Sequence, residues 1–165
     1  MMSKLYRRLA LAALLTSGLT ISSAQAQKER ETPYWASISA TKAMMRAGPG
    51  KNYPASWLFV RPDLPIKVVE TYPNWRKVQD PDGTTGWMLQ RLLSDTRTAL
   101  VTGDEARPMH ERPEQSSRVR FLAEPGVVGR ISKCASDWCE LDVGGRQGYI
   151  RTAHFWGIDP GATLD

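Results

Sequence analysis

The chain has 165 residues and a formal net charge of +5, and this length suits one ordinary domain or two very small ones. Three of the 22 basic residues and none of the 17 acidic residues lie in residues 1–26, so the remainder has 19 basic against 17 acidic residues, a net charge of +2. A nucleic-acid-binding protein needs a basic stripe or cluster. This mixed charge does not supply one, and we therefore expect no nucleic-acid partner.

Residues 1–26 have the layout of a secretory signal peptide. Basic residues precede an unbroken apolar run over Leu9–Leu15, and an A-x-A motif ends at Ala26. The run is far shorter than the ~20 residues of a membrane span, and no other segment is apolar enough to be one. A buried N-terminal helix or a retained anchor is the alternative. We predict cleavage after Ala26 and a periplasmic mature protein without a membrane span.

The following chain predicts short strands rather than helices. Residues 27–33 form a polar lead-in, and from Tyr34 onward short apolar stretches alternate with Gly, Pro, Asn and Asp, which is typical of a β-barrel or sandwich. The sequence predicts strands over 64–72 and 75–80, a turn at 81–83, a third strand from 86, and one turn of 3₁₀ helix within 88–93. We therefore expect an all-β protein.

An internal repeat divides the chain. Asn74-Trp75 returns as Asp137-Trp138 after 63 residues, and Gly86-Trp87 returns as Gly148-Tyr149 after 62 residues. Upstream, Met45–Pro49 corresponds more weakly to Met109–Pro113. Two repeats of about 60 residues match the lower size at which a domain folds alone. The predicted organisation is a lead-in (27–33), repeat one (34–103), repeat two (104–157) and a C-terminal tail (158–165).

Cys134 and Cys139 are the only two cysteines. In an oxidising compartment, an even pair in a small domain predicts a disulfide. A zinc site needs four ligands, or three with water, and the chain has only two histidines. The spacing suits a four-residue hairpin loop built on a type I turn. We predict a structural disulfide, no metal and no cofactor.

The repeats resemble the bacterial SH3-like domain family. Repeat one has the opening R-x-G-P turn at Met45–Gly50, then Tyr53-Pro54, then the W-x-x-V and G-W motifs at Trp75–Val78 and Gly86-Trp87. Repeat two keeps the later half, over 137–150, and has lost the R-x-G-P turn. The whole is similar to exported two-repeat SH3-like proteins of Gram-negative bacteria. The resemblance implies two tandem SH3-like β-barrels that act as a binding module, often targeted to peptidoglycan.

Strand parity suggests a binding face. Trp75 and Trp138 lie on the faces opposite to Val78 and Leu141, so we place the two tryptophans on the polar outer side. Exposed aromatic rings often hold sugars and peptides. The alternative is that each tryptophan packs under a loop or in the seam between the barrels.

The R-x-G-P turn and its following loop complete the candidate. Arg46 either fixes the turn or binds an anionic group, and loops on a rigid barrel often carry binding residues. The candidate groove consists of Arg46, Tyr53, Trp57 and Trp75.

A catalytic constellation is missing from the sequence. A nucleophile needs a neighbouring base and an orienting group, and no G-x-S-x-G, H-E-x-x-H, P-loop or dinucleotide motif is present. We therefore expect a non-catalytic module that binds peptidoglycan or a short peptide. A scaffold or adaptor for another cell-envelope protein is the alternative.

Overall fold

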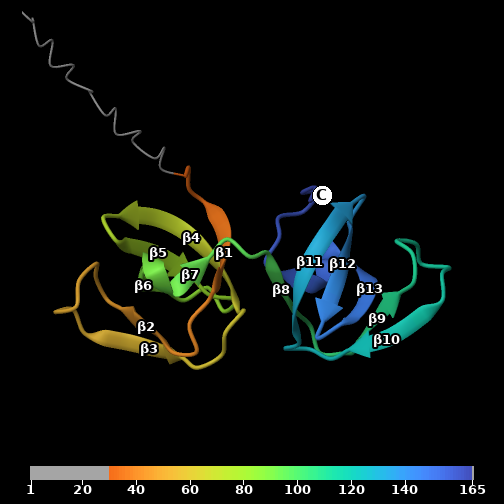
Figure 1. Ribbon diagram of the computed structural model, residues 1–165, viewed down its shortest axis with the longest axis horizontal. Coiled ribbons are helices and arrows are strands. Elements are labelled where there is room, and N and C mark those ends of the chain that lie inside the picture. Colours follow the sequence, from red (N-terminus) through yellow and green to blue (C-terminus); the bar gives the residue numbers. More distant parts are fainter. Residues whose placement is uncertain (1–29, 165) are drawn as a thin grey trace, which may run out of the picture.

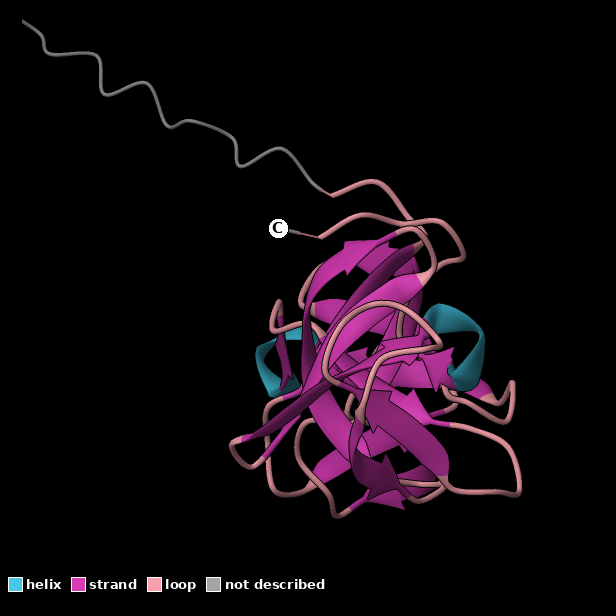
Figure 2. Cartoon of the chain, turned by 90° about the vertical axis from the view of Figure 1, so that its right-hand side faces the viewer, coloured by secondary structure: helices cyan, strands magenta, loops and turns pink. Residues whose placement is uncertain are grey.

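A computed structural model describes residues 30–164 as two all-β units that lie side by side (Figure 1). The predicted signal peptide, residues 1–26, lies outside the described residues. Each unit is one seven-stranded sheet, and the described helices are single 3₁₀ turns, one in each unit (Figure 2). The expected all-β fold in two repeats is confirmed. Within the described part of the chain, no helix has the length and apolar content to cross a membrane.

Barrel one is the sheet of the first repeat. Its elements are β1 (Tyr34–Ile38), β2 (Ala43–Arg46), β3 (Ala55–Phe59), β4 (Pro65–Tyr72), β5 (Trp75–Gln79), β6 (Thr85–Leu89), η1 (Gln90–Leu92) and β7 (Leu93–Ser94). The strand order is β3-β2-β6-β5-β4-β1-β7. The strands predicted over 64–72 and 75–80 and the 3₁₀ turn are confirmed. Asp80 accepts backbone hydrogen bonds from Asp82 and Thr84 through Oδ1, and these bonds fix the predicted turn.

Barrel two repeats this topology. Its elements are β8 (Thr98–Val101), β9 (Arg107–His110), β10 (Val119–Ala123), β11 (Val128–Ala135), β12 (Trp138–Val143), β13 (Arg146–Arg151), η2 (Thr152–His154) and β14 (Phe155–Trp156). The order β10-β9-β13-β12-β11-β8-β14 matches that of barrel one strand for strand. Strand β8 lies before the boundary expected after residue 103. It belongs to the second sheet because it pairs with β11 and β14.

The central hairpin of each barrel closes through a two-residue turn. Tyr72 pairs with Trp75 in β4–β5, and Ala135 pairs with Trp138 in β11–β12. In the second hairpin Ser136 and Asp137 have φ of 49° and 64°, as expected for the tight turns that suit strand twist. The four-residue loop expected between the cysteines is therefore wrong, because the ladder continues past them to Ala135 and Trp138.

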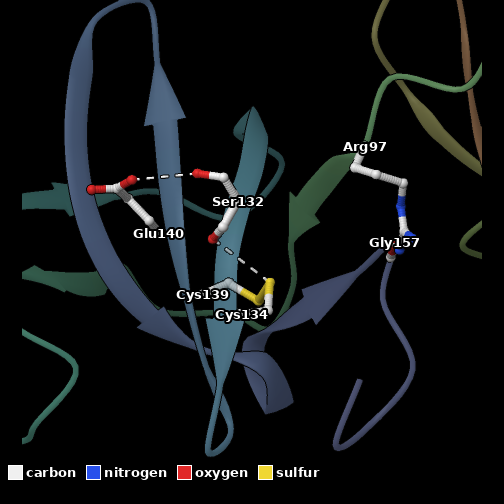
Figure 3. Close-up of a disulfide and its surroundings, with 6 residues drawn as sticks. All are labelled: Arg97, Ser132, Cys134, Cys139, Glu140 and Gly157. Carbon is white, nitrogen blue, oxygen red and sulfur yellow. Dashed lines mark hydrogen bonds between the residues drawn. A yellow bond between two sulfur atoms is a disulfide. The ribbon is translucent and has the colours of Figure 1, made fainter. Parts of the chain in front are cut away.

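The predicted disulfide is confirmed. Cys134 and Cys139 are bonded across β11 and β12, with their Cα atoms 4.1 Å apart (Figure 3). Both side chains are buried in the core of barrel two. On the same hairpin, the Ser132 hydroxyl donates to the Glu140 carboxylate at 3.3 Å. The hairpin is thus held by a covalent bond inside and a polar contact farther along.

Each barrel has its own hydrophobic core. Val78 and Leu141 are fully buried in the cores of barrels one and two, as strand parity predicts. Met45 and Met109 also occupy the two cores, and the weak upstream repeat therefore reflects equivalent core positions. Ile158, in the predicted tail, packs into the core of barrel two.

A polar and aromatic seam joins the barrels. The Trp35 and Trp156 rings meet edge to face, with centroids 4.9 Å apart. Asp159 accepts hydrogen bonds from Trp35 Nε1 at 2.9 Å and from Lys67 Nζ at 3.0 Å. Arg61 also donates to the carbonyl of Gly126 at 2.8 Å. Contacts from both repeats therefore hold the two barrels against each other.

Candidate functional site

The structure brings Arg46 and Trp75 together. Both line a pocket of about 460 Å³ on barrel one, together with Leu58 of the edge strand β3. This pocket adjoins a second one of about 640 Å³, and both are lined by Lys51, Leu89 and Arg91. We call the two adjoining pockets the barrel-one groove.

Trp75 lines this groove from a packed position. Trp75 is only 8% exposed and is absent from the apolar core of barrel one, so the predicted face is right and the predicted exposure is wrong. Its cross-strand partners in the sheet are Tyr72 and Leu89. Trp75 is therefore packed rather than exposed, and it lines the barrel-one groove rather than the seam named in the alternative.

Trp138 is packed in a similar way in barrel two. Its ring is 6% exposed, and the Arg151 guanidinium carbon lies 5.1 Å from the ring centroid. The His110 ring meets Trp138 edge to face at 5.3 Å. These two side chains cover the indole, and so Trp138 offers little surface to a ligand.

Arg46 fixes the loop that follows it. Its Nη1 donates to the carbonyl oxygen of Tyr53 at 2.7 Å, and the Tyr53 ring lies so close to Gly48 that a Cβ there would clash with it. The turn therefore requires glycine, and the arginine ties the two ends of the loop together. Arg46 still lines the groove, so the two roles weighed for it from the sequence are compatible.

Trp57 does not line the groove. It is 60% exposed, and its partner across the β2–β3 ladder is Met45, whereas the partner of the groove residue Leu58 is Met44. Neighbouring residues of a strand point to opposite faces, so Trp57 stands on the other side of β3 from Leu58, and it lines neither pocket of the groove. Among the six tryptophans it is the exposed one.

Arg76 is a groove residue that sequence reasoning did not select. It is 9% exposed and lines the larger pocket. Its Nε donates to the Tyr34 hydroxyl at 3.1 Å, and its Nη1 donates to the carbonyls of Tyr72 at 3.1 Å and Trp75 at 2.8 Å. The alternation of side chains along β5 places Arg76 on the same inward face as Val78. A cation on that face needs buried hydrogen-bond partners, and this pattern could have identified Arg76 from the sequence.

His110 and the two cysteines have structural partners. The Nδ1 of His110 lies 3.0 Å from the carbonyl of Ser117, so it is the protonated nitrogen and donates to that oxygen. Both cysteines are in the disulfide. Within residues 30–164 there is no group of three His, Cys, Asp or Glu side chains arranged to hold a metal ion. The barrel-one groove, with pockets of about 460 and 640 Å³, is therefore the candidate binding site that we favour.

Comparison with known proteins identifies both repeats. The family model described as bacterial SH3 domain matches the chain twice, over residues 39–95 and 103–157. The two matches together cover more than half of the chain. No match was found among the curated proteins.

Among solved structures, the chain is similar to an NlpC/P60 family protein from Bacillus cereus, with 13% identity, a TM-score of 0.34, and coverage of 74% of this chain and 56% of that one. It is also similar to NlpC2 from Trichomonas vaginalis, with 10% identity, a TM-score of 0.34, and coverage of 78% and 49%. The chain thus spans about half the length of these structures.

Proposed function

The chain belongs to the bacterial SH3 domain family, and from this premise we propose that it is a non-catalytic binding module of the periplasm. Its ligand is the peptide part of peptidoglycan, held in the barrel-one groove. The observation that carries the proposal is the groove itself, a concave surface with an apolar floor at Trp75 and polar groups at its rim. Ligand sites commonly have this composition.

Three further features support the proposal. The resemblance to SH3-like modules supplies peptidoglycan as the ligand class. The disulfide between Cys134 and Cys139 suits an exported protein. The hydrogen bonds of Arg46 and Arg76 hold both guanidinium groups in place before a ligand arrives, which lowers the entropy cost of binding.

A specific observation favours the adaptor alternative. Strands β3 and β10 are each the terminal strand of their sheet, and both expose apolar side chains, including Trp57, Leu58, Phe121 and Leu122. Exposed edges of this kind accept a strand from a partner protein. Because the seam joins the two barrels, the edge strands β3 and β10 would both be offered to a partner by a single unit.

Co-sedimentation with purified cell-wall sacculi tests the first proposal. We expect the mature protein to sediment with sacculi, and Leu58→Gln to weaken this by about tenfold, a loss of about 1.4 kcal/mol. The matched control is Leu122→Gln, since Leu122 has the same place in β10 as Leu58 has in β3 and is also exposed. Trp75→Ala is unsuitable, because truncating a buried tryptophan costs about 3–5 kcal/mol of stability.

The outcomes separate the two functions. Binding that Leu58→Gln weakens and Leu122→Gln leaves intact supports the groove. An equal loss in both variants, or a loss in Trp57→Ala alone, moves binding to the strand edges. If the wild-type protein does not bind sacculi but binds an envelope protein, the result supports the adaptor role.

A further inference from the structure

We infer that the barrel-one groove recognises the carboxylates of its peptide ligand, an inference that rests on the proposed function and names the chemistry of the same site. The groove is lined by five cationic side chains: Lys42, Arg46, Lys51, Arg76 and Arg91. Among the described residues, none of the five forms an ion pair with a carboxylate. The fold therefore gathers these cations around two adjoining pockets without pairing them with a carboxylate.

Nearby acidic residues do not offset this charge. The acidic residue that lines the groove is Asp95, which already pairs with Arg30 at 3.1 Å. The other ion pairs that involve barrel-one residues are Lys77–Glu70 and the seam pair Lys67–Asp159, and their residues lie outside the groove lining. Like charges that share a surface repel one another, so a cluster of this kind is unfavourable for the folded chain alone.

Barrel two shows that the fold does not require these cations. Loops 47–54 and 111–118 close with the same three backbone hydrogen bonds, shifted by 64 residues, and the turns after β6 and β13 bond to the two hairpins in the same way. This correspondence fixes the equivalent positions. In barrel two the five cations are replaced by Ala106, His110, Gln115, Cys139 and Ala153.

The replacements are informative because the surrounding structure is kept. Four of the five are residues that carry no charge at any pH near neutrality, and the fifth, His110, is buried and engaged with Ser117. Barrel two therefore folds in the same topology without these five cations, and its cation near the equivalent tryptophan is Arg151, which takes the place of Leu89 and lies over Trp138. The charge on barrel one belongs to a task that barrel two does not share.

The arrangement fits an extended peptide that bears carboxylates. Lys42, Lys51 and Arg91 are exposed and free to approach a ligand, whereas the guanidinium groups of Arg46 and Arg76 are fixed by hydrogen bonds to backbone carbonyls. Charge-assisted hydrogen bonds to carboxylates are about twice as strong as neutral ones. The apolar floor of Trp75 and Leu89 lies among these cations and would accept a short aliphatic side chain.

Peptidoglycan peptides supply this chemistry, since they combine free carboxylates with small aliphatic side chains. The decisive experiment modifies the ligand and leaves the protein intact. Sacculi whose carboxylates have been converted to amides with carbodiimide and ammonia are compared with untreated sacculi in co-sedimentation. We expect amidation to weaken binding by at least tenfold, and 0.5 M NaCl to weaken binding to untreated sacculi, because salt screens exposed charges.

A pair of variants tests the same inference from the protein side. Lys51→Gln combined with Arg91→Gln removes two exposed groove cations, and we expect about tenfold weaker binding. The control combines Arg118→Gln with Arg130→Gln, which removes two exposed cations from barrel two and equalises the net charge. Circular dichroism verifies that both double variants are folded.

The results distinguish this inference from the proposed function. Equal binding to native and amidated sacculi would overturn carboxylate recognition and leave peptidoglycan binding standing. Equal weakening by the two double variants would show a net-charge effect and would also overturn it. If native sacculi are not bound, the proposed function and this inference both fail. Binding of a glutamate-rich synthetic peptide in that case would assign the groove to an acidic protein segment.

Discussion

The two barrels stabilise their equivalent central hairpins, β4–β5 and β11–β12, in different ways. Residues 71 and 76 pair across the β4–β5 hairpin, and the positions 63 residues later hold Cys134 and Cys139, which form the disulfide of barrel two. Barrel one has Thr71 and Arg76 at these positions. The covalent bond of one barrel is replaced in the other by a buried guanidinium that bonds to Tyr34 and to two carbonyls.

This exchange separates stability from recognition. A disulfide in barrel two fastens the hairpin and offers no charge to a ligand. Arg76 in barrel one fastens the equivalent hairpin and also lines the larger pocket of the groove. In barrel one, the side chain that holds the hairpin is therefore also available for electrostatic contact with a ligand.

Replacing Arg76 should give the largest effect. Arg76→Met keeps the aliphatic stem but leaves the Tyr34 hydroxyl and the carbonyls of Tyr72 and Trp75 without their donor. Buried hydrogen bonds to a charged group contribute about 1.5–3 kcal/mol, so we expect barrel one to lose about 3 kcal/mol. Hydrogen exchange measured by mass spectrometry should show faster exchange in β4 and β5.

The location of the change is the critical readout for Arg76. Exchange in β11 and β12 should stay close to that of the wild type, because the disulfide holds that hairpin independently. A uniform increase in both barrels would show that the seam couples them into one unfolding unit. Unchanged exchange in β4 and β5 would contradict the role assigned to the guanidinium.

Removing the disulfide should give a smaller effect in the other barrel. The bridge joins residues five apart in sequence, and for so short a loop the chain-entropy model gives about 2 kcal/mol. We expect the double variant Cys134→Ala/Cys139→Ala to lower the stability of barrel two by this amount. Thermal melts and hydrogen exchange of β11 and β12 check the prediction, with β4 and β5 as the internal reference.

The sequence predicts the fold well because its signals are local and occur twice. The alternation of Val78 and Leu141, the Gly86-Trp87 and Gly148-Tyr149 pairs, and the turn at 81–83 each specify a strand or a turn by themselves. The disulfide also follows from composition and compartment. These features need no knowledge of which strands lie side by side.

The site is harder to predict because it depends on tertiary neighbours. Parity predicts the correct face for Trp75 but could not show that the side chain is buried there. Arg46 and His110 illustrate the same limit, since both tie down the same loop through the carbonyls of Tyr53 and Ser117 although repeat two has lost the R-x-G-P turn. The two equivalent loops keep the same backbone while their side chains differ. A sequence motif describes the side chains alone, so it cannot reveal that the backbone is retained.

The smallest effect concerns acid sensitivity, which should differ between the barrels at one position. His154 of η2 has Leu92 as its counterpart in η1. Burial, and then the charges of Arg107 and Arg151, lower the pKa of His154 below its ordinary value, so the folded chain favours the neutral ring.

As the pH falls through about 6.5, the unfolded chain binds the proton first and the folded state loses stability. Because the side chain is only partly buried, solvent screens these interactions, and the loss should be the smallest of the three effects. Urea unfolding of the wild type and of His154→Leu at pH 7.5 and pH 5.0 measures it. The wild type should lose more stability than the variant on acidification, and equal losses would show that His154 does not contribute to the difference.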